Sequence, residues 1–315
     1  MLVSVGLLIL SIVLLFLGAE FLVKGSSAIA LKAGISPLVV GLTVVAFGTS
    51  MPELLVSIQA SWQGSGGMAV GNVVGSNIFN ICVILGISAM INPLSIQLQV
   101  IKFDTPVLLM VTILFIVVFI DQTIGRLEGI ILLAGIISYT FFNIRQARLE
   151  NVTPAGAFEI PKTDEKGLPV WKIVLLVSGG LVILGAGSQF LVRGASDIAR
   201  SLNVDEAIIG LTIIAAGTSM PELATSVVAS LRKNADISIG NIIGSNIFNL
   251  LGIIGVTGTI NPIQASNISW IDIGVMFFAA VVLLPLMKSD KAITKYEGFF
   301  LLLVYAGYLY YLWPA

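Results

Sequence analysis

The chain contains no histidine, one cysteine and few charged residues of either sign. Histidine is the commonest metal ligand and the usual general base near neutral pH, so its absence disfavours zinc sites and most hydrolytic enzymes. The single thiol, Cys82, can form no internal disulfide. Charged residues occupy 10% of the 315 positions, against about 25% in soluble domains. This composition argues against a soluble enzyme, a disordered chain and, with a net charge of −1, a nucleic-acid binder.

Hydrophobic residues make up 57% of the chain, and its mean hydropathy is +1.04. A transmembrane helix needs about 20 mostly apolar residues to cross roughly 30 Å of hydrocarbon. The sequence therefore predicts an all-α polytopic membrane protein with ten transmembrane helices. The expected spans are Leu2–Val23, Pro37–Ser61, Met68–Met90, Asp104–Ile120, Gly125–Phe142, Val170–Val192, Val204–Leu231, Ile237–Ile260, Ile271–Met287 and Tyr296–Leu312. Re-entrant half-helices remain an alternative at Pro52 and Pro221, which interrupt two of these stretches.

The two halves of the chain repeat each other at a constant offset of 169 residues. Residues 38–61 read LVVGLTVVAFGTSMPELLVSIQAS and residues 207–230 read AIIGLTIIAAGTSMPELATSVVAS, with 14 of these 24 positions identical. GNVVGSNIFN at residues 71–80 likewise aligns with GNIIGSNIFN at residues 240–249. Because each copy holds five expected helices, the second copy must enter the membrane from the opposite face. Inverted repeats are a transporter architecture, with the substrate site near the membrane midplane.

A polar segment from about Gln146 to Lys166 separates the two copies. It contains two prolines and a concentration of charged residues, which is typical of a surface linker. The expected organisation is therefore a first five-helix repeat over residues 1–145, a cytoplasmic linker over residues 146–169 and a second, inverted five-helix repeat over residues 170–315.

Lysine and arginine are unevenly distributed between the expected loops. With the N-terminus outside, thirteen of the 16 basic residues fall in inner loops, and only Arg126, Arg193 and Arg200 fall in outer loops. Positive residues accumulate on the cytoplasmic side of membrane proteins. We therefore expect a multi-pass protein of the inner or plasma membrane with both termini outside.

Glu53 and Glu222 lie about midway along their expected spans, and no lysine or arginine lies at a comparable depth. A charged side chain at that depth costs about 2.5–3.5 kcal/mol and by default marks a functional site. Two such acids would be protonated or would repel each other, and a bound cation removes both difficulties. A protonated glutamate that hydrogen-bonds between helices is the structural alternative.

The residues that precede each acid favour the cation. In the motif GTSMPE, at residues 48–53 and again at 217–222, proline has no N–H, so the carbonyl four residues earlier loses its helical partner. We expect the helix to unwind there and to turn carbonyls towards a cavity. The threonine and serine hydroxyls lie four and three residues before the acid, which places them near the carboxylate.

Polar residues recur every fourth position in the next expected helix of each half. The first stripe is Asn72, Ser76 and Asn80, and the second is Asn241, Ser245 and Asn249. Serine and asparagine also join transmembrane helices, and the neighbouring GxxxG patterns favour close packing. We interpret the stripes as serving both roles, with the glycines allowing the polar residues to approach the glutamates.

The oxygen atoms available in these motifs indicate which ion they suit. No sulfur or imidazole lies near, which disfavours a soft transition metal. Two bidentate carboxylates and two or more carbonyls supply the six to eight oxygens that Ca²⁺ prefers. Two negative charges balance one Ca²⁺, and the surrounding neutral oxygens suit Na⁺.

The twin GTSMPEL and GNxxGSNIFN motifs resemble the α-repeats of the cation/Ca²⁺ exchanger superfamily, specifically its prokaryotic Na⁺/Ca²⁺ exchanger branch. The resemblance covers all ten expected helices. It implies antiport of Na⁺ against Ca²⁺ by alternating access, three for one and hence electrogenic. It also implies that the glycine-rich first and sixth helices slide over the other eight. The chain would then be a transporter and not an enzyme, with no cofactor, with Ca²⁺ and Na⁺ as substrates, and with the lipid bilayer but no protein as its partner.

The resemblance also implies a set of ligands. Glu53 and Glu222 would hold Ca²⁺ bidentately, together with the backbone carbonyls of Thr49 and Thr218. Flanking Na⁺ sites would use the carbonyls of Ala46 and Ala215, the carboxylates, and the hydroxyls of Ser50, Ser219, Ser76 and Ser245. Asn80 and Asn249 would line the centre of the site.

One position departs from several members of the superfamily. The K⁺-dependent exchangers, among others, carry aspartate where this chain has Asn249, and two site carboxylates instead of three argue against K⁺ co-transport. The H⁺/Ca²⁺ branch shows a GNxxE-type motif where this chain has GTSMPE, and proton coupling is the main alternative function. A Ca²⁺-permeable channel is a further alternative, although acidic channel rings usually come from symmetric subunits.

The distribution of basic residues makes a testable prediction of topology. In a Cys82→Ser background, a cysteine placed in the connection over residues 61–67 should react with an impermeant thiol reagent in intact cells, because that connection faces outside. A cysteine placed in the segment from Gln146 to Lys166 should not react until the cells are opened. Labelling of this second cysteine in intact cells would show that the assignment is reversed.

Overall fold

The computed structural model describes residues 2–150, 168–202, 215–266 and 268–312. The first part of the chain comprises α1 (Leu2–Ala33), α2 (Pro37–Val40), η1 (Gly41–Val45), α3 (Ala46–Thr49), α4 (Met51–Trp62), α5 (Gly66–Phe79), η2 (Asn80–Ile84), α6 (Leu85–Ile91), β1 (Leu94–Ser95), η3 (Val100–Asp104), α7 (Thr105–Val118), β2 (Thr123–Ile124) and α8 (Arg126–Glu150). The second part comprises α9 (Val170–Ser201), α11 (Ala215–Thr218), α12 (Met220–Leu231), α13 (Ala235–Ile247), η6 (Phe248–Ile253), α14 (Ile254–Ile260), β3 (Ile263–Gln264), α15 (Trp270–Ser289), β4 (Ala292–Ile293) and α16 (Lys295–Leu312). Elements labelled η are π-helical turns within longer helices.

Within the described residues, seven helices are long and apolar enough to cross a membrane, or eight if the bent pair Pro37–Thr49 and Met51–Trp62 forms one span. The expected multi-pass helical fold is therefore confirmed, and the count of ten remains a prediction. The expected span Val204–Leu231 lies partly outside the described residues, since only its portion from residue 215 is described. The expected span Tyr296–Leu312 lies in α16, which also carries Lys295, Glu297 and five tyrosines that lower its hydropathy. Most of the expected linker, residues 151–167, lies outside the described residues as well.

The elements of the second part follow those of the first at the same offset of 169 residues that relates the sequences. The short helices α3 and α11 correspond residue for residue, as do α4 and α12, and α6 and α14. The strands β1 and β3 also correspond, as do β2 and β4. The motifs repeated in the sequence therefore occur in the same local structures, including the interruption between α3 and α4 and between α11 and α12.

The inner layer of the molecule consists of the helices that carry the asparagine and serine stripes. The apolar window of the span Ala235–Ile260 is 94% buried and that of Gly66–Ile91 is 72% buried, against 28% for Val3–Ala33 and 22% for Val170–Ser201. The main apolar core, which includes Ile78, Phe115, Ile247 and Leu283, surrounds these two inner helices. The polar stripes therefore lie at the centre of the bundle and not at its lipid-facing surface.

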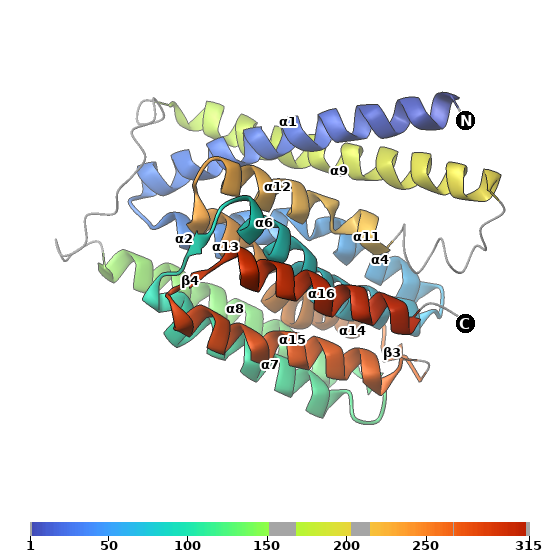
Figure 1. Ribbon diagram of the computed structural model, residues 1–315. Helices are drawn as coiled ribbons and strands as arrows, with labels where there is room; N and C mark the ends of the chain where they lie inside the picture. The colour runs from blue at the N-terminus through green and yellow to red at the C-terminus, as the bar shows by residue number, and fades with distance from the viewer. Residues whose placement is uncertain (1, 151–167, 203–214, 267, 313–315) are drawn as a thin grey trace.

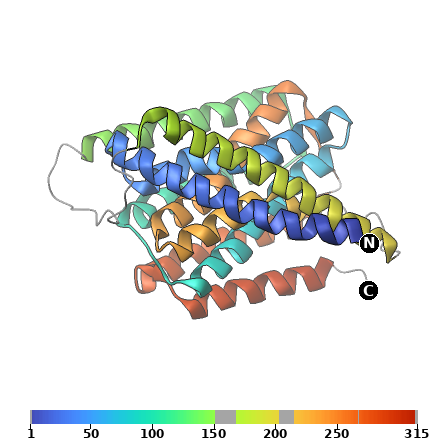
Figure 2. The same cartoon turned by 90° about the horizontal axis from the view of Figure 1, so that it is seen from above.

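The long helices α1 and α9 lie side by side as an outer pair, obliquely across the rest of the bundle (Figures 1 and 2). A Cβ added at Gly18 would lie 2.9 Å from the Gly180 carbonyl oxygen, and one added at Gly194 would lie 2.8 Å from the Ser4 carbonyl oxygen. These contacts run in opposite directions along the two helices, so the pair is antiparallel. Each helix has 32 residues, or about 48 Å at 1.5 Å per residue. Both extend beyond the spans expected from the sequence and exceed the hydrocarbon thickness unless they are tilted.

Two short ladders join connections from opposite halves of the chain. Strand β1 pairs antiparallel with β4, where Leu94 lies opposite Ile293, and β2 pairs antiparallel with β3, where Ile124 lies opposite Ile263. Two-residue strands leave no alternating pattern in the sequence, so the expectation of an all-helical chain did not include them. The ladders connect the ends of the bundle across the two halves.

Candidate functional site

Each GTSMPE motif forms a break between two helical segments. Ser50 separates α3 from α4 with φ −84° and ψ 9°, and Ser219 separates α11 from α12 with φ −85° and ψ 9°. The break before α4 bends the chain by 44°. In both motifs proline occupies the first turn of the resumed helix, where its missing N–H leaves no helical bond unmade. The predicted interruption is therefore confirmed.

The break places each acid in the first turn of a new helix. Glu53 lies in the first turn of α4 and Glu222 in that of α12, and each is only 1% exposed. The N-terminus of a helix carries a partial positive charge from its unpaired N–H groups. This local field favours a carboxylate, but a charge buried in a membrane protein still requires a counter-charge.

Hydrogen bonds between the halves bring the two acids into one site. Ser50 Oγ donates to Glu222 Oε1 over 2.7 Å, and Ser219 Oγ donates to Glu53 Oε1 over 2.9 Å. Ser219 Oγ also lies 3.1 Å from Ser76 Oγ. Each serine thus binds the carboxylate of the other motif and not its own. The sequence placed Ser50 near Glu53 by helical spacing, and the structure corrects this pairing because the helix is interrupted at the serine.

One oxygen of each carboxylate remains without a partner among the described residues. Glu53 Oε2 and Glu222 Oε2 are buried and accept no hydrogen bond, and neither acid forms an ion pair with a described lysine or arginine. No group of three or more acidic, cysteine or histidine side chains occurs within the described parts of the chain. The site therefore offers two carboxylates, each with one oxygen free to bind a cation.

The threonines and asparagines of the motifs form a second set of crossed bonds. Thr49 Oγ1 donates to Asn241 Oδ1 over 3.1 Å, and Thr218 Oγ1 donates to Asn72 Oδ1 over 3.4 Å. The Asn241 amide in turn donates to the Glu222 carbonyl at 3.2 Å and to Ser226 Oγ at 2.9 Å. Asn72 makes the matching bonds to the Glu53 carbonyl, at 3.1 Å, and to Ser57 Oγ, at 3.0 Å. These asparagines fix the backbone at both acids.

Asn72 and Asn241 belong to the stripes in the sequence but not to the expected ligand set. Their amide groups are used in bonds to helices α4 and α12, so we assign them a positioning role. Ser57 and Ser226, their partners, are fully buried, and sequence reasoning missed both. The signal that could have found them is their identity in the two halves at the offset of 169.

The expected central residues Asn80 and Asn249 form the start of η2 and part of η6, and each is 1% exposed. Asn249 Nδ2 donates to Asn77 Oδ1 over 2.9 Å, and Asn77 Nδ2 donates to the Asn246 carbonyl over 3.2 Å. Both amide atoms of Asn80 and the Asn249 Oδ1 atom have no hydrogen-bond partner among the described residues. The side-chain oxygens of Asn80 and Asn249 are therefore buried without a described partner. Asn77 and Asn246, whose hydrogen bonds connect Asn249 to the neighbouring helix, were not among the residues expected from the sequence.

The remaining expected site residues lie beside these groups. Ser245 Oγ lies 3.5 Å from the Ala46 carbonyl oxygen, and Thr49 Oγ1 lies 3.3 Å from the same oxygen. Ala215 begins α11 at the corresponding position of the second motif. Hydrogen bonds thus connect Ser76 and Ser219 to Glu53, and Ser50 to Glu222, whereas no described bond joins Asn80 or Asn249 to either glutamate.

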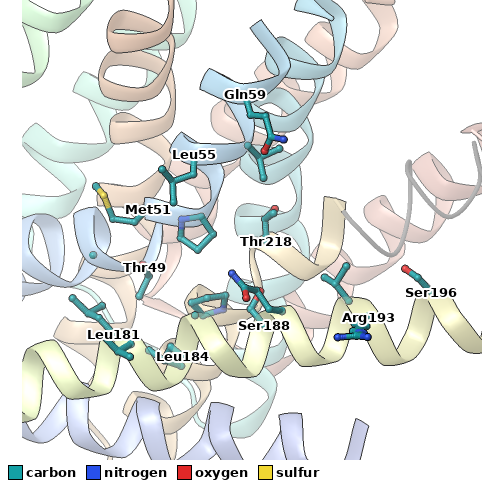
Figure 3. A pocket seen from close by; sticks show the side chains of 18 of the residues that line it. Thr49, Met51, Leu55, Gln59, Leu181, Leu184, Ser188, Arg193, Ser196 and Thr218 are labelled. Atoms are coloured by element: carbon teal, nitrogen blue, oxygen red, sulfur yellow. The ribbon is translucent and has the colours of Figure 1, made fainter. Parts of the chain in front are cut away.

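A cavity of about 720 Å³ lies between α4 and α9 and extends to the edge of this site. Its lining includes Pro52 and Pro221, together with Thr49 and Thr218 (Figure 3). Leu55 and Gln59 of α4 face residues of α9 such as Ser188 and Arg193 across it. The cavity therefore adjoins both helix breaks on the side of α9.

The fold and the site together define a polytopic helical membrane protein with a buried site made by two broken helices. A model of the sodium/calcium exchanger protein family matches residues 3–145 and 172–313. The chain belongs to this family. Because the family consists of exchangers, the chain is a multi-pass membrane transporter of the cation/Ca²⁺ exchanger superfamily, as the motifs had indicated.

Several relatives are similar over their whole length. The chain is 37% identical to the putative antiporter CaxA of Alkalimonas amylolytica over all of both chains, and 31% identical to the sodium/calcium exchanger MaX1 of Methanosarcina acetivorans over 98% of each. Its structure is similar to that of the sodium-calcium exchanger NCX_Mj soaked with Na⁺ and Ca²⁺, with a TM-score of 0.85, 30% sequence identity and 99% of each chain covered.

The crossed asparagine bonds predict a measurable contribution to stability. Asn241→Ala should lower the stability by about 1–3 kcal/mol, because it leaves the buried Glu222 carbonyl and the Ser226 hydroxyl with an unmet hydrogen bond. Thermal unfolding of the purified protein in detergent measures this loss. Ser178→Ala, which removes an exposed hydroxyl bonded only within its own helix, is the control and should change little. Equal unfolding temperatures for the two variants would contradict the positioning role.

Proposed function

We propose that the protein is a secondary antiporter that exchanges Na⁺ for Ca²⁺ at the site between the two helix breaks. The observation that carries the proposal is the pair of crossed serine–glutamate bonds, which leaves one buried oxygen of each carboxylate without a partner. Two carboxylates balance the charge of one Ca²⁺ and supply hard oxygen ligands. Their burial without a described basic partner makes an empty, doubly charged site costly. A cation must therefore occupy the site for most of the cycle.

Glu53 and Glu222 would bind Ca²⁺ together with the carbonyls of Thr49 and Thr218. The carbonyls of Ala46 and Ala215 and the hydroxyls of Ser50, Ser219, Ser76 and Ser245 would bind Na⁺, with Asn80 and Asn249 at the centre. The unpaired oxygens of Asn80 and Asn249 support this assignment. The Ser50 and Ser219 hydroxyls already donate their hydrogens to carboxylates, so a bound ion would use the lone pairs of these hydroxyl oxygens.

The paired geometry supports an inverted repeat with five helices in each copy. The corresponding helices α1 and α9 are antiparallel, and the crossed bonds at the site relate equivalent residues of the two halves. Such a repeat can present one site alternately to the two membrane faces. We propose that α1 and α9 move as a pair over the remaining helices, because glycines mediate their mutual contact and each is little buried.

The charge of the site bears on coupling. One Ca²⁺ neutralises the two carboxylates and three Na⁺ exceed them by one charge, so exchange in this ratio is electrogenic. The relative MaX1 is named a sodium/calcium exchanger, which favours Na⁺ as the coupled ion. With Asn249 instead of a third acid, transport should be independent of K⁺. Both termini would face outside the cell membrane and residues 146–169 the cytoplasm.

Replacement of either central acid should nearly abolish Ca²⁺ transport. Glu53→Gln or Glu222→Gln keeps the shape of the side chain but removes half of the charge that compensates a divalent ion. Ca²⁺ uptake into proteoliposomes driven by an outward Na⁺ gradient measures the effect. Asp290→Asn removes an exposed carboxylate far along the sequence from the motifs and should retain wild-type uptake. Wild-type uptake by Glu222→Gln would refute the shared site.

The identity of the coupled ion can be determined by imposing gradients one at a time. A Na⁺ gradient at symmetric pH should drive Ca²⁺ flux, K⁺ should have no effect, and an inside-negative potential should favour Ca²⁺ leaving as Na⁺ enters. If Ca²⁺ moves only with a pH gradient, the Na⁺ assignment is wrong and H⁺/Ca²⁺ exchange replaces it. Flux that needs no opposing ion gradient and does not saturate would indicate a channel.

A further inference from the structure

A bidentate ion pair joins the outer helix α1 to the end of α12. Arg232 Nε and Nη2 donate to Glu20 Oε1 over 3.0 and 2.8 Å, and Nη2 donates to Glu20 Oε2 over 2.6 Å. The Glu20 side chain is 22% exposed and the Arg232 side chain 62% exposed. This fork-to-fork geometry is the arrangement in which an arginine–carboxylate pair is strongest.

A hydrogen bond two residues after Arg232 makes a second contact with α1. Asn234 Nδ2 donates to Ser27 Oγ of α1 over 3.3 Å. Arg232 is the C-cap of α12 and Asn234 is the N-cap of α13. The short connection between these two helices therefore contacts α1 at two points. We call the region formed by this connection and the adjoining part of α1 the Arg232 end of the molecule.

The other half of the chain builds the same connection without these side chains. At the offset of 169, Arg232 corresponds to Gln63 and Asn234 to Ser65, while Glu20 corresponds to Gln189 and Ser27 to Ser196. We call this matched region the Gln63 end. Gln63 and Gln189 are described residues, but the structure records no bond between them, and the buried Ser196 Oγ has no partner among the described residues.

The two connections have the same backbone, so the difference lies in the side chains. Lys233 and the corresponding Gly64 both have positive φ, 59° and 73°. The Lys233 N–H donates to the Ser230 carbonyl over 3.0 Å, and the Gly64 N–H donates to the Ser61 carbonyl over 3.0 Å. The loop at Gly64 and the loop at Lys233 therefore share one backbone structure, but among the described residues only the second carries an ion pair to the neighbouring long helix.

The packing of the long helices is also tighter at the Arg232 end than at the Gln63 end. At the Arg232 end, Leu15, Ala19 and Leu22 of α1 share one apolar cluster with Val228 and Ala229 of α12. At the Gln63 end, the cavity of about 720 Å³ separates α9 from α4, and Gln189 belongs to its lining. Gln59 and Ser196 also line it (Figure 3). The structure is closed where the ion pair exists and open where it is absent.

We propose that Glu20 and Arg232 form a conformational latch that favours the state open at the Gln63 end. This inference rests on the proposed alternating access. If the two halves were identical, the two open states would be related by the two-fold axis of the repeat and would have equal energy. Any preference must therefore come from residues that differ between the halves. Movement of the α1–α9 pair that opens the Arg232 end breaks the ion pair, and no matching pair forms at the other end. In the expected topology the latch keeps the cytoplasmic side closed.

The size of the preference follows from the position of the pair. Partly exposed ion pairs are modest and are screened by salt, with bidentate arginine pairs the stronger ones. Loss of the latch should therefore shift the ratio of the two states by about two- to fivefold. High ionic strength should produce a shift in the same direction in the unaltered protein.

The latch can be tested by measuring how fast single cysteines react at each end. In a Cys82→Ser background, Gln59→Cys reports on the cavity and Val228→Cys, the matched position, reports on the closed end. Purified protein in lipid nanodiscs, without Ca²⁺, is treated with a water-soluble maleimide. Choline chloride adjusts the ionic strength, because Na⁺ is a proposed substrate. Asp290→Asn is the control for loss of one carboxylate.

Glu20→Gln and Arg232→Gln should each slow labelling at position 59 and speed labelling at position 228, so that the ratio of the two rates falls by about two- to fivefold. The exchanged pair Glu20→Arg with Arg232→Glu should restore the original rates. Transfer of the pair, by Gln189→Glu and Gln63→Arg in the protein that lacks the original latch, should shift the rates further in the same direction.

Unchanged rates in the single variants, or rates that the exchanged pair fails to restore, would overturn the latch. Faster labelling at both positions would indicate general loosening, and it too would overturn the latch. The labelling requires no transport, so the two proposals fail separately. A protein that exchanges Na⁺ for Ca²⁺ with unchanged labelling refutes the latch alone, whereas opposite shifts in labelling without Na⁺-driven Ca²⁺ flux refute the proposed function alone.

Discussion

The burial of Glu53 and Glu222 without a described basic partner is the constraint on which the rest of the structure depends. Both carboxylates are 1% exposed, and each acquires its place from a helix that stops one turn earlier and starts again. The new helix directs its positive end at the acid, while a serine from the opposite break donates to one oxygen. These devices stabilise negative charge only in part, and the proposed function assigns the remaining compensation to a bound cation.

The packing around the site reconciles two opposing requirements. The inner helices must be rigid enough to hold two breaks together, and the asparagines Asn72 and Asn241 provide this by tying the backbone at each acid to the next helix. In the proposed cycle the outer pair α1 and α9 moves, and this pair is less buried and packs through glycines at its own interface. The polar bonds of the site are therefore concentrated in the inner helices, whereas α1 meets the bundle through an apolar cluster and the Glu20–Arg232 ion pair.

The near-symmetry of the halves gives particular weight to positions where they differ. Glu20 and Arg232 have the neutral counterparts Gln189 and Gln63 on an equivalent loop. A difference of one ion pair is small compared with the stability of the fold, but it acts on two states that the repeat makes nearly equal in energy. An equilibrium between two such states responds to small differential contacts.

The sequence by itself determined that the chain crosses a membrane several times, that it repeats at 169 residues and that a helix breaks just before Glu53 and just before Glu222. Apolar length, sequence identity and proline chemistry are local properties, which is why the sequence records them. Only the tertiary structure decided that Ser50 serves Glu222 and Ser219 serves Glu53, that Asn77 and Asn246 join the centre, and that the strands pair across the halves. Those contacts join residues at least 139 positions apart (Ile124 and Ile263), and no local pattern records them. Only the tertiary structure likewise showed that Glu20 of α1 meets Arg232 at the end of α12, because these residues are 212 positions apart in the sequence.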